Sequence, residues 1–255
     1  MSLQSVATTW PAIVENHDSA GPILLVCEHA SNAFPAPWGQ LGLTEAQQQA
    51  HVAWDPGALA LSRALASRLD AVLIHAPASR LLYDLNRGPD RADAMAPRSE
   101  VHDIPGNIAL SVAQRLERTE AFYLPFHGRL HAEIARRLAL GRQTVLVTVH
   151  SFTPVYHGQI RAVEFGVIHD ADDRLARAIV AAAQQITPLV TALNQPYSAA
   201  DGVTHTLRLH ATPYGLVNAM LELRNDLIAT PAQVEGVADQ LAPVLLRALS
   251  LLSEG

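Results

Sequence analysis

The chain has a single cysteine, Cys27, which excludes a disulfide bond within the chain. It has no apolar run close to the roughly 20 residues that a transmembrane helix requires. Its first residues, Met1 to Trp10, lack the basic start and the long apolar core of a signal peptide. These absences are typical of a protein of the reducing cytoplasm. We therefore expect a cytoplasmic protein that does not bind a membrane.

Positive charge is also scarce, because 18 Lys and Arg face 24 Asp and Glu, which gives a net charge of -6. This balance disfavours nonspecific binding to nucleic acid. No Gly/Ser-rich linker, low-complexity tract or internal repeat interrupts the 255 residues, of which 49% are hydrophobic. A chain of this length can bury one large core. We therefore expect a single domain over residues 1–255.

The hydrophobic pattern predicts alternating strands and helices. Residues 22–28 and 71–75 are expected as strands, and the helix between them, at about 56–69, begins with Asp55 as its cap and Pro56 in its first turn. This order predicts a parallel pair of strands with a right-handed crossover. The other expected elements are an arm or edge segment at 1–20, a short helix after Thr44, a helical region at about 108–140 that breaks near Pro125, strands at 144–149, 163–168, 203–210 and 216–223, and helices at 172–186 and 231–252.

Two of the expected strands end abruptly in polar side chains. Glu28 and His29 follow the apolar run 23–27, and His150 follows the run 144–149. Ligands of open α/β sheets bind at the carboxyl ends of the strands. We therefore expect His29 and His150 to meet in space and to hold a metal ion. Two histidines and one carboxylate, with a fourth position open, form the usual hydrolytic zinc site.

Three residues are candidates for the third metal ligand. We select Glu28, which is adjacent to His29, although neighbours on a regular strand point in opposite directions and only a bend would let both bind. Without such a bend, Glu28 would orient His29 instead. Asn32 follows His29 by three residues, and Asp55 begins a helix that should lie near the same edge of the sheet.

Glu222 is the candidate catalytic residue, because it lies in an apolar strand where an unpaired carboxylate is costly to bury. It is either a general base that takes a proton from water and passes it to the leaving amine, or the ion-pair partner of Arg224 or of another arginine. Arg80, Asn86 and Arg87 are suited to binding a substrate carboxylate, because guanidinium groups hold carboxylates through two parallel hydrogen bonds.

The segment 79–89, which contains these three residues, alternates polar and apolar side chains. If it is extended, Arg80, Asp84 and Asn86 lie on one side of it. Arg87 has a competing interpretation as a surface ion pair with a neighbouring aspartate, which would contribute little to stability.

Ser31, His127 and Arg224 complete the candidates for substrate binding. His127 and His131 are one helical turn apart and form a second possible metal pair. Other chemistries are disfavoured, because Ser31 lacks the Gly-x-Ser-x-Gly elbow of serine hydrolases. No Gly-Lys-Ser/Thr follows the glycine-containing loop at 39–42, which excludes a phosphate loop there.

Taken in order, these motifs resemble the N-formylglutamate amidohydrolase family. The resemblance covers roughly residues 22–228 and implies an α/β fold of three layers, in which helices cover both faces of a mixed, mostly parallel central sheet. Such a phosphorylase/hydrolase-like fold is related to zinc carboxypeptidases and to the aspartoacylase group. The motifs are Cys-Glu-His-Ala-Ser-Asn at 27–32, Trp-Asp-Pro-Gly-Ala at 54–58, Ser-Arg-Leu-Leu-Tyr-Asp-Leu-Asn-Arg at 79–87, Tyr-Leu-Pro-Phe-His at 123–127, Val-His-Ser-Phe at 149–152 and Leu-Glu-Leu-Arg-Asn-Asp-Leu at 221–227.

The resemblance further implies metal-dependent hydrolysis of an amide bond in a small N-acyl acidic amino acid such as N-formylglutamate, with Zn²⁺ or another divalent metal as cofactor. The stretch 84–87 resembles the one with which the aspartoacylase group holds a substrate carboxylate, and Glu222 matches the general base of that group. The chain departs from the His-x-x-Glu of zinc carboxypeptidases, since Ala-Ser-Asn follows His29. Family members that act in histidine breakdown tend to have Pro where this chain has Glu28.

These departures leave two alternatives open. One is a non-catalytic small-molecule-binding protein that retains the pocket. The other is a hydrolase of a different ester or amide in the same pocket.

Overall fold

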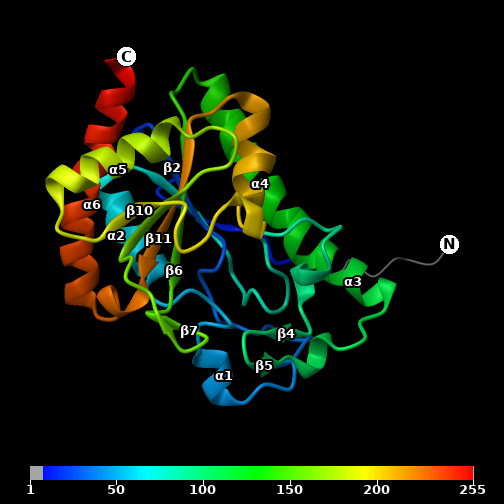
Figure 1. Cartoon of the computed structure of the whole chain (residues 1–255). Helices are drawn as coiled ribbons and strands as arrows, with labels where there is room; N and C mark the ends of the chain where they lie inside the picture. The colour runs from blue at the N-terminus through cyan, green and yellow to red at the C-terminus, as the bar shows by residue number, and fades with distance from the viewer. Residues whose placement is uncertain (1–7, 255) are drawn as a thin grey trace.

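A seven-stranded sheet forms the centre of the computed structural model, which describes residues 8–254 (Figure 1). The strand order is β1-β3-β2-β6-β11-β9-β10. Neighbouring strands are parallel, except that β1 is antiparallel to β3 and β9 is antiparallel to β11, so the sheet is mixed and mostly parallel. The strands are β1 (Ile13–Glu15), β2 (Ile23–Cys27), β3 (Val72–His75), β6 (Val145–Phe152), β9 (Phe165–Ile168), β10 (Thr191–Leu193) and β11 (Asn218–Arg224).

Helices cover both faces of this sheet. Leu25 of β2 and Val147 of β6 belong to the core beneath α2, α5 and α6, whereas Leu24 and Leu146 share the opposite core with Phe126 of α4. Figure 1 shows α2, α5 and α6 together on one side of the sheet and α4 on the other. The predicted α/β fold with three layers is therefore confirmed. The helices are α1 (Glu45–Gln49), α2 (Ala58–Leu69), α3 (Val112–Arg118), α4 (Leu124–Ala139), α5 (Arg174–Ile186) and α6 (Pro231–Ser253).

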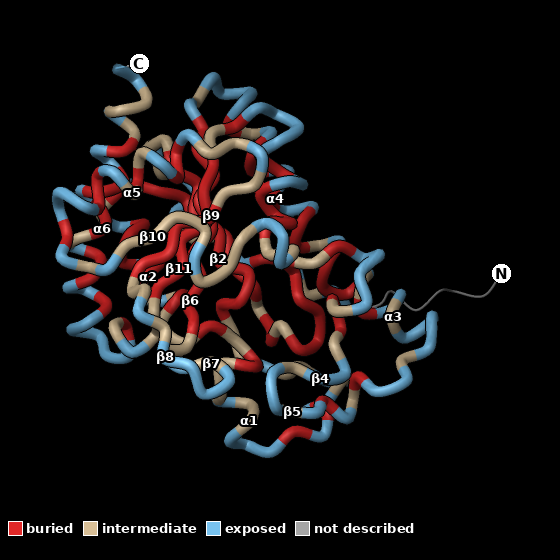
Figure 2. Tube along the Cα trace, viewed as in Figure 1, coloured by how far each residue is buried: buried red, intermediate tan, exposed pale blue. Residues whose placement is uncertain are grey.

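Strands β2, β3, β6 and β9 are buried from end to end, and β11 is buried up to Arg224, as the red segments of Figure 2 show. Two small hairpins and several short helical turns lie outside the main sheet. No helix in the described range 8–254 is both long enough and apolar enough to cross a bilayer. The hairpins are β4 (Arg98–Ser99) with β5 (His102–Asp103) and β7 (Val155–Tyr156) with β8 (Gln159–Ile160), and the turns are η1 (Ala92–Met95), η2 (Pro105–Asn107), η3 (Thr119–Tyr123), η4 (Ala199–Asp201), η5 (Leu207–Ala211), η6 (Thr212–Tyr214) and η7 (Asn225–Leu227).

Most of the expected elements are present near their predicted bounds. Thr44 caps α1, as expected, by accepting a hydrogen bond from the backbone N–H of Gln47. The strands β2 and β3 are parallel and flank α2 in the sequence. Pro125 lies in the first turn of α4, directly after the π-helical turn η3, where the long helical region was expected to break. Residues 13–15 form the edge strand β1, and residues 1–7 of the expected arm lie outside the described residues.

Two local predictions are wrong, and the condition set for the segment 79–89 is not met. Residues 203–210, expected as a strand, contain helical turns, because the buried residues Leu207, His210 and Ala211 follow a helical spacing. Residues 79–89 form turns rather than an extended segment.

The other wrong prediction concerns the start of α2. Gly57 occupies the cap position at a φ of 82°, and α2 has no side-chain cap there. Only the backbone carbonyl of Asp55 joins the first turn, where it accepts from the N–H of Ala58. The side chain of Asp55 turns instead toward two histidines at the edge of the sheet.

We predict that Gly166→Ala lowers the free energy of unfolding by about 3 kcal/mol or more, the size typical of an overpacked core position. Gly166 of β9 pairs in register with Glu222 of β11. A Cβ atom at this position would overlap the carbonyl oxygen of Gln195 and press on the Cβ of Glu222. Urea unfolding followed by circular dichroism measures the change.

Gly128→Ala is the matched control, because Gly128 is exposed in α4 and a Cβ there meets nothing within 4 Å. We expect it to raise the free energy of unfolding by up to about 1 kcal/mol through helix propensity. Equal unfolding free energies for the two variants would contradict the close packing around Gly166.

Candidate functional site

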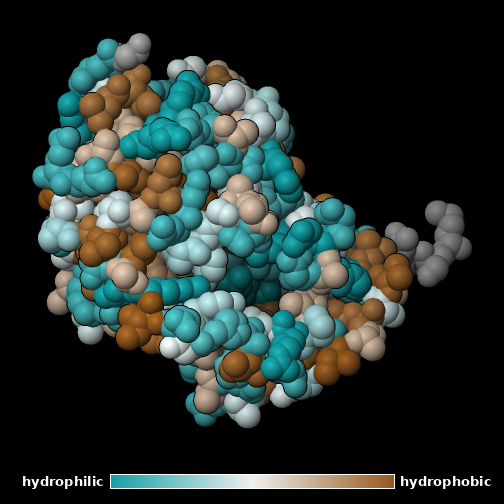
Figure 3. All heavy atoms as spheres, viewed as in Figure 1, coloured by the Kyte–Doolittle hydropathy of each residue, from teal (hydrophilic) through white to brown (hydrophobic). Residues whose placement is uncertain are grey.

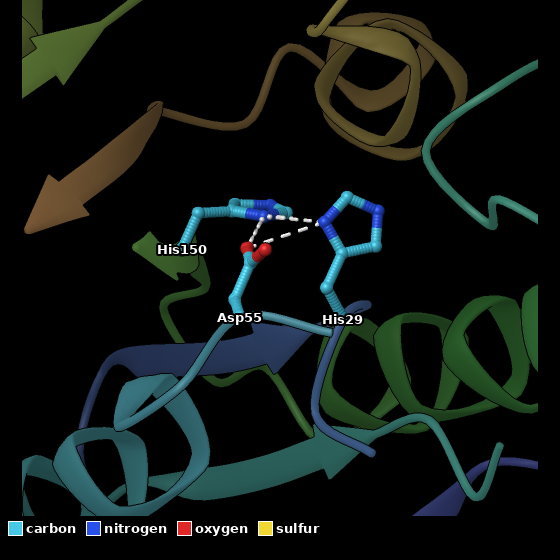
Figure 4. A group of neighbouring side chains, drawn as sticks. All are labelled: His29, Asp55 and His150. Atoms are coloured by element: carbon cyan, nitrogen blue, oxygen red, sulfur yellow. Dashed lines mark hydrogen bonds and ion pairs between the residues drawn. The ribbon is translucent and has the colours of Figure 1, made fainter. Parts of the chain in front are cut away.

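Two histidines and an aspartate meet at the edge of the sheet where β2 and β6 end (Figure 4). The Nδ1 atoms of His29 and His150 lie 3.1 Å apart, and Oδ2 of Asp55 lies 3.2 Å and 2.9 Å from them. All three side chains are buried. Among residues 8–254, this is the one group of at least three His, Cys, Asp or Glu whose ligand atoms all lie within 4.8 Å of one another. The predicted meeting of His29 and His150 is confirmed.

The register of the sheet explains why these residues meet. Val26 of β2 pairs with Thr148 of β6, so the chain just beyond β2 arrives at the level of His150. On the other side of β6, Glu222 of β11 pairs with His150 itself. Asp55 arrives from the segment before α2, where its backbone N–H donates to the carbonyl of His29 at 2.9 Å.

Each histidine has a second carboxylate behind it. Nε2 of His29 lies 2.7 Å from Oδ1 of Asp84, and Nε2 of His150 lies 3.2 Å from Oε2 of Glu28. Both rings therefore present Nδ1 to Asp55 and Nε2 to a further carboxylate. Histidines that ligate metals almost always donate their other ring N–H to such a partner.

Glu28 lies differently from our expectation for a metal ligand. It is on the Nε2 side of the His150 ring, whereas Asp55 lies on the Nδ1 side, next to His29. Strand β2 ends at Cys27, and Glu28 and His29 both lie in the turn that follows it, so their side chains reach different nitrogens of the site. Asp55 therefore completes the group with the two histidines, and Glu28 contacts His150 from the other side of its ring.

The donor set fits a cation. If neutral His29 donates its Nε2–H to the ionised Asp84, the lone pair of its Nδ1 faces Oδ2 of Asp55 at 3.2 Å. Two electron-rich atoms at this distance repel each other unless a positive charge lies between them. Two imidazole nitrogens and a carboxylate oxygen are also ligands that suit zinc.

Arg80 joins the two aspartates of the site. Its Nη1 donates to Oδ1 of Asp55 at 3.2 Å, and its Nη2 donates to Oδ2 of Asp84 at 3.0 Å. Burial alone would raise the pKa of both carboxyls, but His29 and Arg80 outweigh it and hold both pKa values well below the usual range. Burial likewise disfavours a charged His150 ring, yet Glu28 and Asp55 raise its pKa well above the usual range.

Glu222 differs from Glu28, Asp55 and Asp84, each of which lies within 3.2 Å of a histidine nitrogen and has a lowered pKa. It is 5% exposed, and its Oε2 has no hydrogen-bond partner in the described part of the chain. Burial raises its pKa from the ordinary 4.5 to about 7, although the nearby His150 opposes the shift. A carboxyl group with this pKa can both accept and release a proton near neutral pH.

These groups line one cavity of about 190 Å³. Figure 3 shows a recess of hydrophilic side chains on the face where the β4–β5 and β7–β8 hairpins lie. The residues lining the cavity are His29, His51, Val52, Asp55, Arg80, Asn86, Arg87, Ser99, Glu100, His150, Ser151, Tyr156, Tyr197, Val203 and Glu222.

The three residues expected to hold a substrate carboxylate all line this cavity, but they differ in what they can offer. The amide of Asn86 is bonded at both ends, because its nitrogen donates to the carbonyl of Val203 and its oxygen accepts from the N–H of Thr206 at 3.1 Å. Arg80 is shared between two aspartates. Arg87 uses Nε and Nη1 in hydrogen bonds, and its Nη2 has no partner within residues 8–254.

Four other candidates do not line the cavity: Ser31, Asn32, His127 and Arg224. Ser31 accepts a backbone N–H from its own loop, Asn32 donates to a backbone carbonyl of α1, and Arg224 pairs with two acidic side chains. His127 bonds to another histidine rather than to His131, which contacts Tyr214. Each of these groups therefore has a partner away from the cavity.

The sequence reasoning missed several cavity residues. His51, Glu100, Tyr156 and Tyr197 come from separate loops and hairpins, and no motif connects them. Asp84 belongs to a recognised motif, yet its contact with His29 depends on the turn that replaces the expected extended segment.

Comparison with known proteins supports one family. The sequence model of the N-formylglutamate amidohydrolase family matches residues 21–229. The crystal structure of a gene product from Agrobacterium tumefaciens has a TM-score of 0.94 and 49% identity, and the match covers 98% of each chain.

A second solved structure, that of N-formylglutamate amidohydrolase from Ralstonia eutropha JMP134, has the same fold at 16% identity. Its TM-score is 0.67, and the match covers 96% of this chain and 99% of that one. No significant match is found among curated proteins. Because the family match spans most of the sequence and includes His29, Asp55, His150 and Glu222, the chain belongs to the N-formylglutamate amidohydrolase family.

Proposed function

We propose that the protein is a metal-dependent amidohydrolase that cleaves the amide bond of an N-acyl acidic amino acid, with N-formylglutamate as the first substrate to test. The observation that carries the proposal is the meeting of His29, Asp55 and His150 in one cavity with the unpaired Glu222. Membership of the family supports amide hydrolysis. The cavity of about 190 Å³ is smaller than pockets for drug-sized ligands, which favours a small substrate.

In this proposal, Nδ1 of His29, Nδ1 of His150 and a carboxylate oxygen of Asp55 would hold Zn²⁺ or another divalent metal. Three protein ligands leave a position for water or substrate, as in catalytic zinc sites. When bound, the ion supplies Lewis-acid chemistry, which polarises a carbonyl and makes water more acidic. Asp84 and Glu28 orient the two rings through their Nε2 atoms.

Glu222 acts as the general base. It accepts a proton from the attacking water as the water oxygen bonds to the acyl carbon. It then delivers that proton to the amine nitrogen as the C–N bond breaks, so that a carboxylic acid and an amine are the products. Arg87 binds the substrate carboxylate through Nη2, the one nitrogen of its guanidinium that has no partner within the described residues. His29 and, to a smaller extent, Arg80 keep Asp55 and Asp84 ionised.

We predict that Asp55→Asn weakens zinc binding far more than Glu28→Gln does. The first substitution removes an anionic ligand, so the dissociation constant should rise by about 10³-fold or more. The second disturbs only the orientation of His150, for which losses of about 10- to 100-fold are typical. Competition with a chromophoric chelator measures both dissociation constants.

His75→Asn is the control for this pair, because His75 is a buried histidine of the same sheet that bonds to Glu15 rather than to the site. We expect its zinc affinity to equal that of the unmodified protein. A larger loss for Glu28→Gln than for Asp55→Asn would show that Glu28 is the third ligand after all.

Glu222→Gln should lower kcat for hydrolysis of an N-acyl acidic amino acid by about 10²- to 10⁴-fold, the range for loss of a general base. The amide keeps the shape of the side chain but cannot accept the proton, so zinc content should stay unchanged. Amine release and metal analysis of the same samples provide the two readouts. The exposed Glu235→Gln of α6 is the control. Full activity of Glu222→Gln would exclude Glu222 as the base.

Glu222→Gln should also change how stability depends on pH in the metal-free protein. The pKa of Glu222 is raised in the folded state, so folding loses stability as pH rises from about 4.5 through about 7. A shift of this size corresponds to about 3 kcal/mol. The unfolding free energy of Glu222→Gln minus that of the unmodified protein should therefore grow by about this amount between pH 4 and pH 8. A pH-independent difference would show that burial does not raise the pKa.

A further inference from the structure

A second pair of buried histidines lies outside the cavity. Nε2 of His210 and Nδ1 of His127 are 2.8 Å apart, and Nε2 of His127 lies 2.9 Å from the carbonyl oxygen of Leu85. The two rings stack with centroids 5.0 Å apart and an angle of 18° between their planes. They come from α4 and from the π-helical turn η5, and both are buried. Neither belongs to the metal-binding group or lines the cavity.

The direction of these hydrogen bonds follows from their acceptor. The carbonyl of Leu85 can only accept, so His127 donates its Nε2–H. In a neutral ring Nδ1 is then an acceptor, and His210 must donate its own Nε2–H to it. Burial lowers the pKa of His127 to about 3 and that of His210 to about 4, so both rings are neutral at pH 7. One tautomer of each ring satisfies the chain of hydrogen bonds.

Leu85 lies next to the carboxylate that orients His29. Oδ1 of Asp84 lies 2.7 Å from Nε2 of His29, so a shift of the backbone at residues 84–85 would move the partner of that ring. This segment has no strand ladder to hold it. The next two residues of the loop bond to the segment that precedes η5. The side-chain oxygen of Asn86 accepts from the backbone N–H of Thr206, and the guanidinium of Arg87 donates to the carbonyl of Gly202.

We propose that His127 and His210 form a clamp that positions the loop of residues 84–87 and, through Asp84, the ring of His29. His127 and His210 are positioning residues, because they touch neither the cavity nor the metal-binding group. The consequence for metal binding rests on the proposed function, whereas the clamp itself does not.

The first test needs neither metal nor substrate. Nitrogen-15 NMR of histidine-labelled, metal-free protein should show His127 with its proton on Nε2 and with Nδ1 as a hydrogen-bond acceptor. His210 should also carry its proton on Nε2. A proton on Nδ1 of His127 would overturn the clamp, whatever the protein's activity.

The second test is His210→Phe, which keeps a ring in the stack but removes the donor. We expect the NMR signal of His127 Nδ1 to move toward that of an unbonded nitrogen. We also expect the dissociation constant for zinc to rise about 10-fold and kcat to fall. KM should stay within a few-fold of that of the unmodified protein, because the substrate contacts are untouched. His210→Gln can still donate an N–H to His127 and should restore most of the zinc affinity.

Two controls separate positioning from general destabilisation. His131→Phe changes an exposed histidine one turn along α4, and it should change none of the readouts. Ile134→Val removes a buried methylene from the same helix, and it should lower Tm without changing zinc affinity.

A lower Tm for His210→Phe with zinc affinity and kcat unchanged would overturn the positioning role. If the protein binds no zinc at all, the proposed function fails, and the NMR result for His127 still decides whether the clamp exists.

Discussion

The rest of the site depends on how buried carboxylates are neutralised around two imidazoles. Glu28, Asp55, Asp84 and Glu222 all lie within the protein at the edge of one sheet. Burying an ionised carboxylate is costly unless it is paired. The histidines supply partners for the first three, and Arg80 adds a positive charge between Asp55 and Asp84. A divalent cation on the Nδ1 side of both rings would complete this compensation.

The fold could largely be predicted because its strongest signals are local. The apolar runs that form β2, β6 and β11 have the length typical of buried strands, and Thr44 and Pro125 mark the starts of helices by their own chemistry. The short strands β1 and β10 have three residues each, too few for a periodic signal. The prediction of a strand at 203–210 was wrong because the apolar residues there alternate along the chain. In the fold, tertiary packing buries Leu207, His210 and Ala211, which follow a helical spacing.

The site was predictable only where a strand delivers the residue. His29, His150 and Glu222 each follow or lie within an apolar run, so sheet topology alone brings them together. Asp55 lies in the segment before α2. The local sequence favours its side chain as the helix cap, but the side chain contacts His150 instead. Asn86 was selected because its residue type suits substrate binding. In the fold, both the nitrogen and the oxygen of its amide bond to the backbone of a distant segment instead. Such choices depend on three-dimensional contacts that spacing does not encode.

The isolation of Glu222 distinguishes its two sequence-based interpretations. Arg224 is the cation nearest in sequence, yet it pairs with Glu164 and Asp226 instead. The ion-pair interpretation therefore fails for Arg224, and a carboxyl group stays buried with an unpaired oxygen. This arrangement lowers the stability of the fold near neutral pH, because the buried carboxyl group resists ionisation there. Selection for stability alone would therefore not favour it. Glu222 lies at the level of His150 on the neighbouring strand, which is the placement that the proposed proton transfer requires.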